Sequence, residues 1–117
     1  MELFFKMQDG IGLLSFSGGK ILYDNVEKLK KALEYMLNNL PQKTPVVVDL
    51  INIDFIDSAG LGFLVNLKKT LLTRESELAL INIAEPVRQI LQFTHVATYF
   101  ILLDTWKEAV QTFKKQL

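Results

Sequence analysis

The chain lacks the residues from which many functional sites are built. Among its 117 residues there is no cysteine and only one histidine, His95. Without cysteine the chain can form neither a disulfide nor a thiolate metal site, and a lone imidazole has no second imidazole to help it hold a metal. We therefore expect no metal and no cofactor. With no acidic or nucleophilic neighbour, His95 is expected to be a surface or capping residue.

The sequence also lacks an excess of charge and any long apolar run. Thirteen Lys and Arg residues balance thirteen Asp and Glu residues, whereas proteins that bind nucleic acids normally carry a basic excess. No apolar run reaches the roughly 18 to 20 residues that span a bilayer, and the start MELFFKM has no signal-peptide pattern. We expect a soluble, cytoplasmic protein that contacts neither nucleic acid nor a membrane directly.

Apolar residues, by contrast, make up half of the chain. That is enough for one core and too little for two, so residues 1–117 are expected to form a single domain. Two apolar runs around Asp9-Gly10 predict an opening β-hairpin. The run VVVDL lacks polar alternation, which is typical of a strand buried on both faces and requires helices on both sides of the sheet. Further strands are predicted at LALINI and YFILL.

Four helices are predicted from apolar residues that recur at helical spacing. They are expected to begin at a capping box from Asp24 to Glu27, at about Ser58, at Pro86, and at a capping box of Thr105 and Glu108. The apolar stripe of the last helix runs from Trp106 to Leu117. The order ββαβαβαβα predicts an α/β fold: a mixed, mostly parallel sheet of about five strands, with an N-terminal antiparallel hairpin and about four helices.

The segment IDFIDSAGLGFLV, residues 53–65, places polar residues and glycines inside the most apolar part of the chain. It is expected where a central strand ends and a helix begins, the edge at which open α/β sheets usually carry their sites. Asp57 or Ser58 could cap that helix. Gly60 and Gly62 each cost roughly 1 kcal/mol relative to alanine in a helix, so we expect a close backbone approach there, from packing or from a docked partner.

A phosphate on Ser58 would be compatible with this fold and would change its surface. The N-terminus of a helix favours an anion, yet a phosphate adds roughly −1.5 to −2 charge beside Asp57. A partner docked there would lose affinity while the fold stays intact. Two helix-capping residues with no further role would explain Asp57 and Ser58 equally well, and the residues alone leave both interpretations open.

The segment VVVDLINIDFIDSAGLGFLVNLKK closely resembles the signature segment of STAS domains, specifically of the bacterial anti-sigma factor antagonists. The early hairpin, LALINIAEPVRQIL and YFILLDTWKEAV follow the order and spacing of that family over nearly the whole chain. The resemblance implies that Ser58 is phosphorylated by a partner that is both an anti-sigma factor and a serine kinase. Unphosphorylated protein would bind that partner and free a sigma factor, and phosphorylation would break the complex. A PP2C-type phosphatase would then remove the phosphate and restore binding. The chain itself would catalyse nothing.

The resemblance also implies which residues contact the partner. They are Asp57, Ser58, Ala59, Gly60, Gly62 and Phe63 in the signature, with Asp24 and Asn25 bordering the same surface. Two departures from the family pattern are Lys20, where an acidic residue is common, and Val96, where glycine is common. Both are expected in surface segments, and Lys20 changes the charge near the expected interface.

Phe63 could face a partner. It shares a helical stripe with Ala59 and Gly62, on the side of the helix opposite Leu64 and Leu67. Packing in the core is the alternative for a phenylalanine.

Two other functions stay open. STAS domains also serve as constitutive interaction subunits of stressosome or transport assemblies, without a phosphorylation switch. A small-ligand module or an enzyme could use the groove at the carboxyl edge of the sheet with Asp57 as its essential residue, although no second catalytic residue lies near Ser58 in the sequence.

Overall fold

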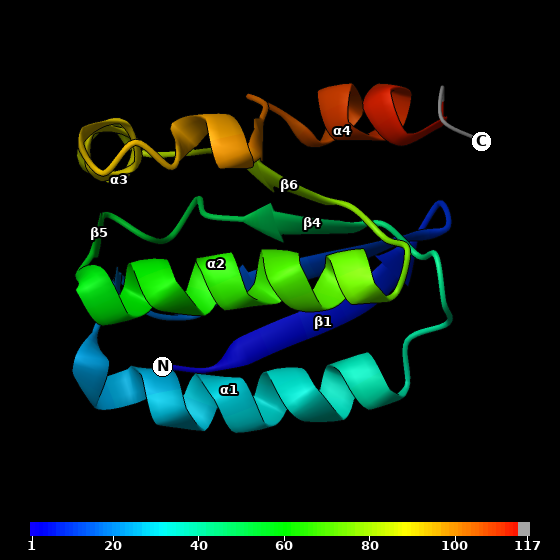
Figure 1. The fold of residues 1–117 in the computed structure, drawn as a ribbon, viewed down its shortest axis with the longest axis horizontal. Helices are drawn as coiled ribbons and strands as arrows, with labels where there is room; N and C mark the ends of the chain where they lie inside the picture. The colour runs from blue at the N-terminus through cyan, green and yellow to red at the C-terminus, as the bar shows by residue number, and fades with distance from the viewer. Residues whose placement is uncertain (115–117) are drawn as a thin grey trace.

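The chain folds into a five-stranded mixed sheet packed between helices (Figure 1). This computed structural model describes residues 1–114. The strand order is β1-β2-β4-β6-β7, with β1 antiparallel to β2 and all other neighbours parallel. The strands span Leu3–Gln8 (β1), Ile11–Phe16 (β2), Val46–Asp49 (β4), Leu78–Ile81 (β6) and Ile101–Leu102 (β7). The predicted fold class is confirmed.

The N-terminal hairpin turns at Asp9 and Gly10, as predicted. Both residues have positive φ, 55° and 76°, which is the backbone of the two-residue type I′ turn that matches the twist of paired strands. Gln8 and Ile11 flank this turn and face each other, so the turn sets the register of the whole ladder. The hairpin supplies an antiparallel edge, because within residues 1–114 β1 pairs with β2 alone.

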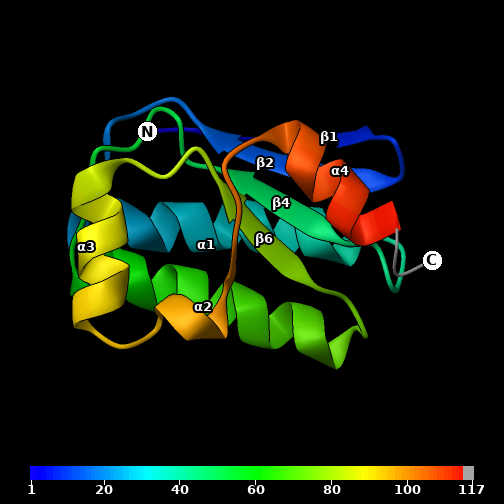
Figure 2. The ribbon, with the colours of Figure 1, turned by 90° about the horizontal axis from the view of Figure 1, so that it is seen from above.

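Helices cover both faces of the sheet, as the unbroken apolar run of β4 predicts (Figure 2). They span Tyr23–Asn38 (α1), Ser58–Thr73 (α2), Glu85–Phe93 (α3) and Trp106–Lys114 (α4). Val46 and Val48 are buried in the main core with residues of α1, α2 and α3, while Val47 is buried in a smaller core with residues of α4. Within residues 1–114, no helix has the length and apolar character needed to cross a bilayer.

The start of α4 agrees with the sequence. Thr105 Oγ1 accepts a hydrogen bond from Glu108 N at 3.2 Å, which caps the helix as predicted. Trp106 then packs, half-buried, against the smaller core. Leu117, predicted to end the apolar stripe of this helix, lies outside the described residues.

The start of α1 differs from the prediction. The helix begins at Tyr23, so a capping box that opens at Asp24 is wrong, and Asp24 lies exposed in the first turn. The capping contact comes from Asn25, whose Oδ1 accepts a hydrogen bond from Leu22 N at 2.9 Å. The sequence alone does not identify the capping residue, because Asp24 and Asn25 are adjacent and either type of side chain can cap a helix.

A second, two-stranded sheet is absent from the sequence-based prediction. β3 (Lys20–Ile21) pairs in parallel with β5 (Phe55–Ile56). The strand that precedes the second helix therefore belongs to this small sheet and is not, as expected, a central strand of the main sheet. β4 ends at Asp49, and the chain forms β5 before α2 begins at Ser58. Strands of two residues leave no periodic pattern from which they could be predicted.

Helix α3 ends in a Schellman motif whose left-handed residue is His95. This residue has φ 62°, its N–H donates to Gln92 O at 3.1 Å, and Val96 N–H donates to Leu91 O at 3.1 Å. His95 is exposed and closes the helix, in agreement with the capping role expected of it. Val96, expected at the surface, is half-buried against the main core. A 3₁₀ turn, η1 (Ala97–Tyr99), follows, so the predicted strand YFILL is reduced to β7.

Replacing His95 with glycine is expected to raise the free energy of unfolding by about 0.5–1 kcal/mol. A left-handed backbone is unfavourable for a residue with a side chain, and glycine removes this cost while losing part of the gain to the larger entropy of its unfolded state. Urea denaturation of both proteins measures the difference. His95→Ala is the matched control, because it keeps the unfavourable backbone; an equal gain in both variants would contradict this account.

Candidate functional site

The carboxylate of Asp57 joins the N-termini of two helices. Its Oδ1 accepts a hydrogen bond from Gly60 N in α2, and its Oδ2 accepts one from Tyr23 N in α1, both at 2.9 Å. Asp57 is thus the N-cap of α2 and also satisfies a free N–H at the start of α1. The N–H groups of Gly60 and Tyr23 lower the pKa of this carboxyl below its ordinary value of 3.8, because they favour the charged form.

Further contacts tie the chain before α1 to the chain before α2. Asp57 N donates a hydrogen bond to Ile21 O at 3.2 Å. Lys20 is exposed, as expected, and forms an ion pair with Asp54 at 3.4 Å. Asn25 Nδ2 donates to Lys20 O at 3.0 Å, so both polar atoms of this side chain are used within its own loop. The two helix starts are therefore held together by β3, β5 and their side chains.

Ser58 is the first residue of α2, and it is exposed. Because Asp57 provides the cap, the hydroxyl of Ser58 is not needed for that role, and it makes no hydrogen bond within residues 1–114. This decides between the two capping candidates in favour of Asp57. In the same described part of the chain no general base is hydrogen-bonded to Ser58 Oγ, so the geometry fits a residue that is modified or contacted better than a nucleophile.

The two glycines of the segment serve different needs. A Cβ on Gly60 would stand 3.1 Å from the carbonyl carbon of Ile21 and closer still to its oxygen, so only glycine lets α2 approach Ile21. A Cβ on Gly62 would meet nothing within 4 Å. Packing therefore accounts for Gly60 and leaves Gly62 unexplained by the fold.

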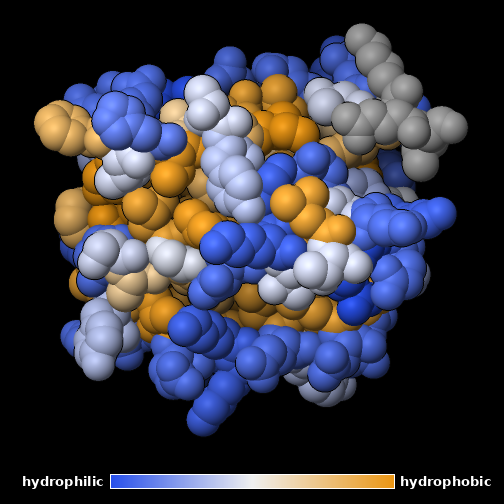
Figure 3. Space-filling model, viewed as in Figure 1, coloured by the Kyte–Doolittle hydropathy of each residue, from blue (hydrophilic) through white to orange (hydrophobic). Residues whose placement is uncertain are grey.

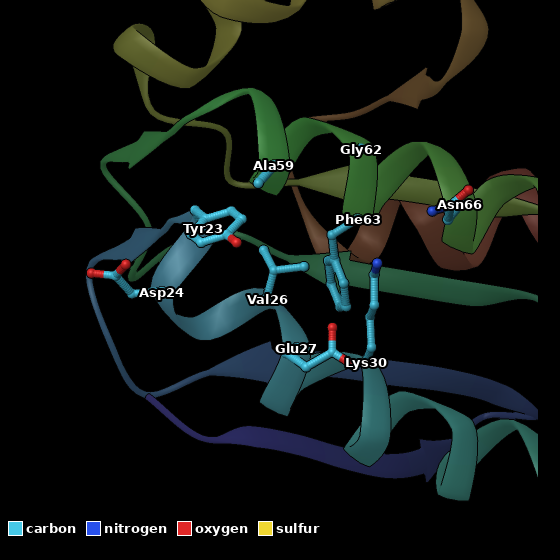
Figure 4. Close-up of a pocket in the computed structure, with 9 residues that line it drawn as sticks. All are labelled: Tyr23, Asp24, Val26, Glu27, Lys30, Ala59, Gly62, Phe63 and Asn66. Atoms are coloured by element: carbon cyan, nitrogen blue, oxygen red, sulfur yellow. The ribbon is translucent and has the colours of Figure 1, made fainter.

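A groove of about 650 Å³ lies between α1 and α2, next to the start of α2 (Figure 4). Of the predicted contact residues, it is lined by Asp24, Ala59, Gly62 and Phe63, whereas Asp57, Ser58, Gly60 and Asn25 lie outside its lining. The sequence analysis misses the other lining residues, Tyr23, Val26, Glu27, Lys30 and Asn66. Glu27 and Lys30 lie off the apolar stripe of α1, which indicates exposure but cannot indicate a groove.

Phe63 has only 1% of its surface exposed, so of its two possible positions the structure shows the one in the core. Its ring packs edge-on against Phe16 of β2, with the ring centroids 6.5 Å apart, and it lies between the two helices at the groove (Figure 4). Helix α2 packs on the sheet with one side and on α1 with another. Its apolar surface is therefore wider than one stripe and buries both Phe63 and Leu64.

An apolar patch lies at the same end of the molecule, between β5 and α3 (Figures 1 and 3). We define this β5–α3 patch as Phe55, Pro86, Ile90 and Phe93, which surround a hollow of about 290 Å³ together with Gln89. Phe93 has 87% and Phe55 41% of its surface exposed. The sequence analysis misses this surface, because nothing local indicates that β5 lies beside α3. The one available signal is that Phe93 falls off the buried stripe of Val87 and Leu91.

Gly60→Ala and Gly62→Ala are expected to change stability in opposite directions. An alanine at position 60 must push α2 away from Ile21, which should cost about 1–3 kcal/mol, as overpacking does elsewhere. At position 62 the methyl group enters open space, and alanine exceeds glycine in helix propensity by about 1 kcal/mol. Chemical denaturation of the three proteins measures both effects. Comparable destabilisation by both substitutions would show that the fold also requires Gly62.

Stability is expected to depend on the charge of Asp57. Its folded-state pKa lies below the unfolded value of 3.8, so its stabilisation is complete above that value and is lost as pH falls through the folded pKa. At neutral pH the wild type should unfold at a higher temperature than Asp57→Asn, and the two midpoints should converge on acidification toward about pH 2. Thermal unfolding across this range measures both. A difference that stays constant with pH would show that the charge contributes nothing.

The chain matches the family model of the STAS domain over residues 5–111. Among solved structures, an anti-sigma-factor antagonist (STAS) domain protein from Planctomyces limnophilus superposes with a TM-score of 0.82 at 21% identity, covering 94% of this chain and 96% of that one. The anti-sigma factor antagonist SpoIIAA in its unphosphorylated form gives 0.77 at 16% identity, with 97% of both chains covered. The Bacillus SpoIIAA in its phosphorylated form gives 0.68 at 16%, with 96% and 99% covered.

At these identities the structural similarities show a common fold, and the family model adds a match in sequence. That match spans nearly all of the described residues, including the segment from Asp57 to Gly62 on which the site is built. The sheet order, the N-terminal hairpin and the helices on both faces agree with it. The chain belongs to the STAS domain family.

Proposed function

We propose that this chain is an anti-sigma factor antagonist whose binding is switched by phosphorylation of Ser58. The unphosphorylated chain binds an anti-sigma factor that is also a serine kinase, and a sigma factor is released. Transfer of the γ-phosphoryl group of ATP to Ser58 Oγ by that kinase ends the complex, and a PP2C-type phosphatase restores the hydroxyl. In this scheme the chain is a cytoplasmic binding protein and not an enzyme.

The observation that carries the proposal is the division of roles between two adjacent residues. Asp57 holds both helix starts through two backbone N–H groups, while Ser58 is exposed and its hydroxyl is unused by the fold in the described residues. A phosphate on Ser58 therefore adds roughly −1.5 to −2 charge to the surface without removing a structural hydrogen bond. SpoIIAA, which has a similar fold, has been solved in both unphosphorylated and phosphorylated forms, which supports the same modification here.

The surface on either side of Ser58 suits a protein partner. Ala59, the next residue, lines the α1–α2 groove, where Gly62 leaves room for close approach. Phe55, three residues before Ser58, belongs to the β5–α3 patch, and exposed aromatic residues often dominate the energy of protein interfaces. A phosphate on Ser58 would place its charge between the two surfaces.

The predicted contact residues divide into two groups in this proposal. One group contacts the partner directly and consists of Ser58, Ala59, Gly62 and Asp24. The other group supports this surface through hydrogen bonds or packing and consists of Asp57, Gly60, Asn25 and Phe63.

Intact-mass spectrometry after incubation with ATP and each anti-sigma factor kinase of the host tests the modification. The wild type is expected to gain one phosphoryl group and Ser58→Ala none. Ser17→Ala is the control, because Ser17 is another exposed serine, with an Oγ that accepts a hydrogen bond from Glu2 N, and this variant should be modified like the wild type. No gain of mass with kinases that phosphorylate another substrate would contradict the proposal.

Calorimetric titration of the same kinase, without ATP, tests the consequence for binding. Ser58→Ala is expected to bind like the wild type, and Ser58→Asp to bind roughly tenfold more weakly or worse, because a charge enters the centre of the interface. Binding that ignores Ser58→Asp would identify a constitutive interaction subunit, as in stressosome or transport assemblies.

A further inference from the structure

No strand among the described residues pairs with the outer edge of β1, which runs along the upper side of the view in Figure 2. Its pairing with β2 is continuous from Leu3 to Gln8, with no bulge or proline to interrupt the strand. Ser17 N donates to Glu2 O, so the backbone groups of every second residue from Glu2 point to β2, and those of Leu3, Phe5 and Met7 point outward. An edge of this length readily pairs with another chain unless it is shielded.

Four of the six side chains of β1 are apolar, and hollows flank this edge on both faces of the sheet. Phe4 has 50% and Met7 48% of its surface exposed. On the α1 side, a groove of about 520 Å³ is lined by Leu3, Phe5, Ala32, Tyr35, Met36 and Asn39. On the opposite side, a hollow of about 270 Å³ is lined by Phe4, Phe5, Lys6, Leu13 and Ser15. Both hollows would receive side chains of an added strand.

We infer that β1 pairs with β1 of a second copy of this chain, antiparallel, about a two-fold axis at Phe4. In this arrangement Glu2 faces Lys6 of the second copy, Leu3 faces Phe5, and Phe4 faces its own counterpart. Lys6 is the only charged residue of β1, and Glu2 directly precedes the strand. Both are exposed, and neither forms an ion pair within the described residues. The short sequence ELFFK is therefore complementary to itself.

Other registers lose this match. With the axis at Phe5, Lys6 would face Phe4 and Glu2 would face Gln8. With the axis at Leu3, Glu2 would face Phe4 and Lys6 would extend past the start of β1. An axis between two residues is excluded, because opposite side chains would then point to different faces of the sheet. Charge complementarity thus selects one register, and it selects a second copy as the occupant of the edge.

The selected register also satisfies the backbone and the hollows. Leu3 and Phe5 both direct their backbone groups outward, so each exchanges hydrogen bonds with the other residue of the second copy. On one face, Phe5 of the second copy lies beside the groove at Tyr35 and Met36. On the other, the two Phe4 rings meet across the axis. The result is an isologous dimer with one continuous sheet and a Ser58 site on each copy. This inference is independent of the proposed function.

Reversal of charges tests the register. Molar mass is measured by light scattering for the wild type, Lys6→Glu, Glu2→Lys and the double variant, over about a hundredfold range of concentration. The wild type and the double variant are expected to approach twice the chain mass of 13.4 kDa. Each single variant should stay at 13.4 kDa, because it sets like charges opposite each other. All substitutions are at exposed positions, and circular dichroism verifies that each variant is folded.

Two results would overturn the inference. One is a wild type that remains monomeric at the highest concentration. The other is a dimer that the single reversals leave intact or that the double reversal fails to restore, because such a dimer would use another surface.

Cross-linking at the axis provides an independent measurement, since the chain has no cysteine of its own. Phe4→Cys places two thiols in a pair without mutual backbone hydrogen bonds, where Cα atoms lie about 4.5 Å apart and a disulfide can form. Gln8→Cys is the matched control, because Gln8 is exposed on the same face of β1 but lies far from the axis. After mild oxidation, only Phe4→Cys should give a covalent dimer. Equal cross-linking of both variants, or of neither, would contradict the proposed register.

Discussion

The two hydrogen bonds that Asp57 accepts, from Gly60 N in α2 and Tyr23 N in α1, are the constraint on which the site depends. Each helix start has N–H groups without a partner in its own helix, and here one carboxylate satisfies a group from each. The two helices are thereby held together at one end. Gly60 completes the arrangement, because it lets α2 approach Ile21 O. The groove between the helices and the exposed start of α2 both follow from this geometry.

Because of this constraint, the fold depends on Asp57, and the neighbouring Ser58 remains available to a partner. If Ser58 capped α2, a phosphate on it would disturb the helix start that presents it. Because the neighbouring Asp57 is the cap, the hydroxyl of Ser58 stays outside the hydrogen bonds of the described fold. The two glycines divide in the same way: Gly60 is required by packing, and Gly62 faces open space in the groove. A site of this kind can change its charge while its supporting structure stays the same.

This STAS domain has two proposed binding surfaces, and they use different residues. The proposed partner surface is built from α1, β5, α2 and α3, where the groove and the β5–α3 patch flank Ser58. The proposed self-association surface is the free edge of β1. Helix α1 borders both surfaces, but with Tyr23 to Lys30 near Ser58 and with Ala32 to Asn39 near β1. Pairing of two copies through β1 therefore leaves a site of the same construction on each.

The sequence by itself determined the main elements, their order and the segment that carries the site. Turn chemistry at Asp9-Gly10 and the apolar run of β4 are local signals, and a capping side chain such as Thr105 acts on N–H groups only a few residues away. The polar residues around Asp57 were also visible locally, because they interrupt the most apolar stretch of the chain.

Only the tertiary structure decided which of those residues serves the fold and which serves the surface. Asp57 caps α2 through the nearby Gly60 N, but its second hydrogen bond, from Tyr23 N 34 positions away, exists only in the folded chain. Phe55 and Phe93 line one hollow only because β5 contacts α3. Phe63 is buried because α2 packs against α1 as well as against the sheet. Helical periodicity reports one buried face of an element, whereas a second buried face arises only when separate segments of the chain come together.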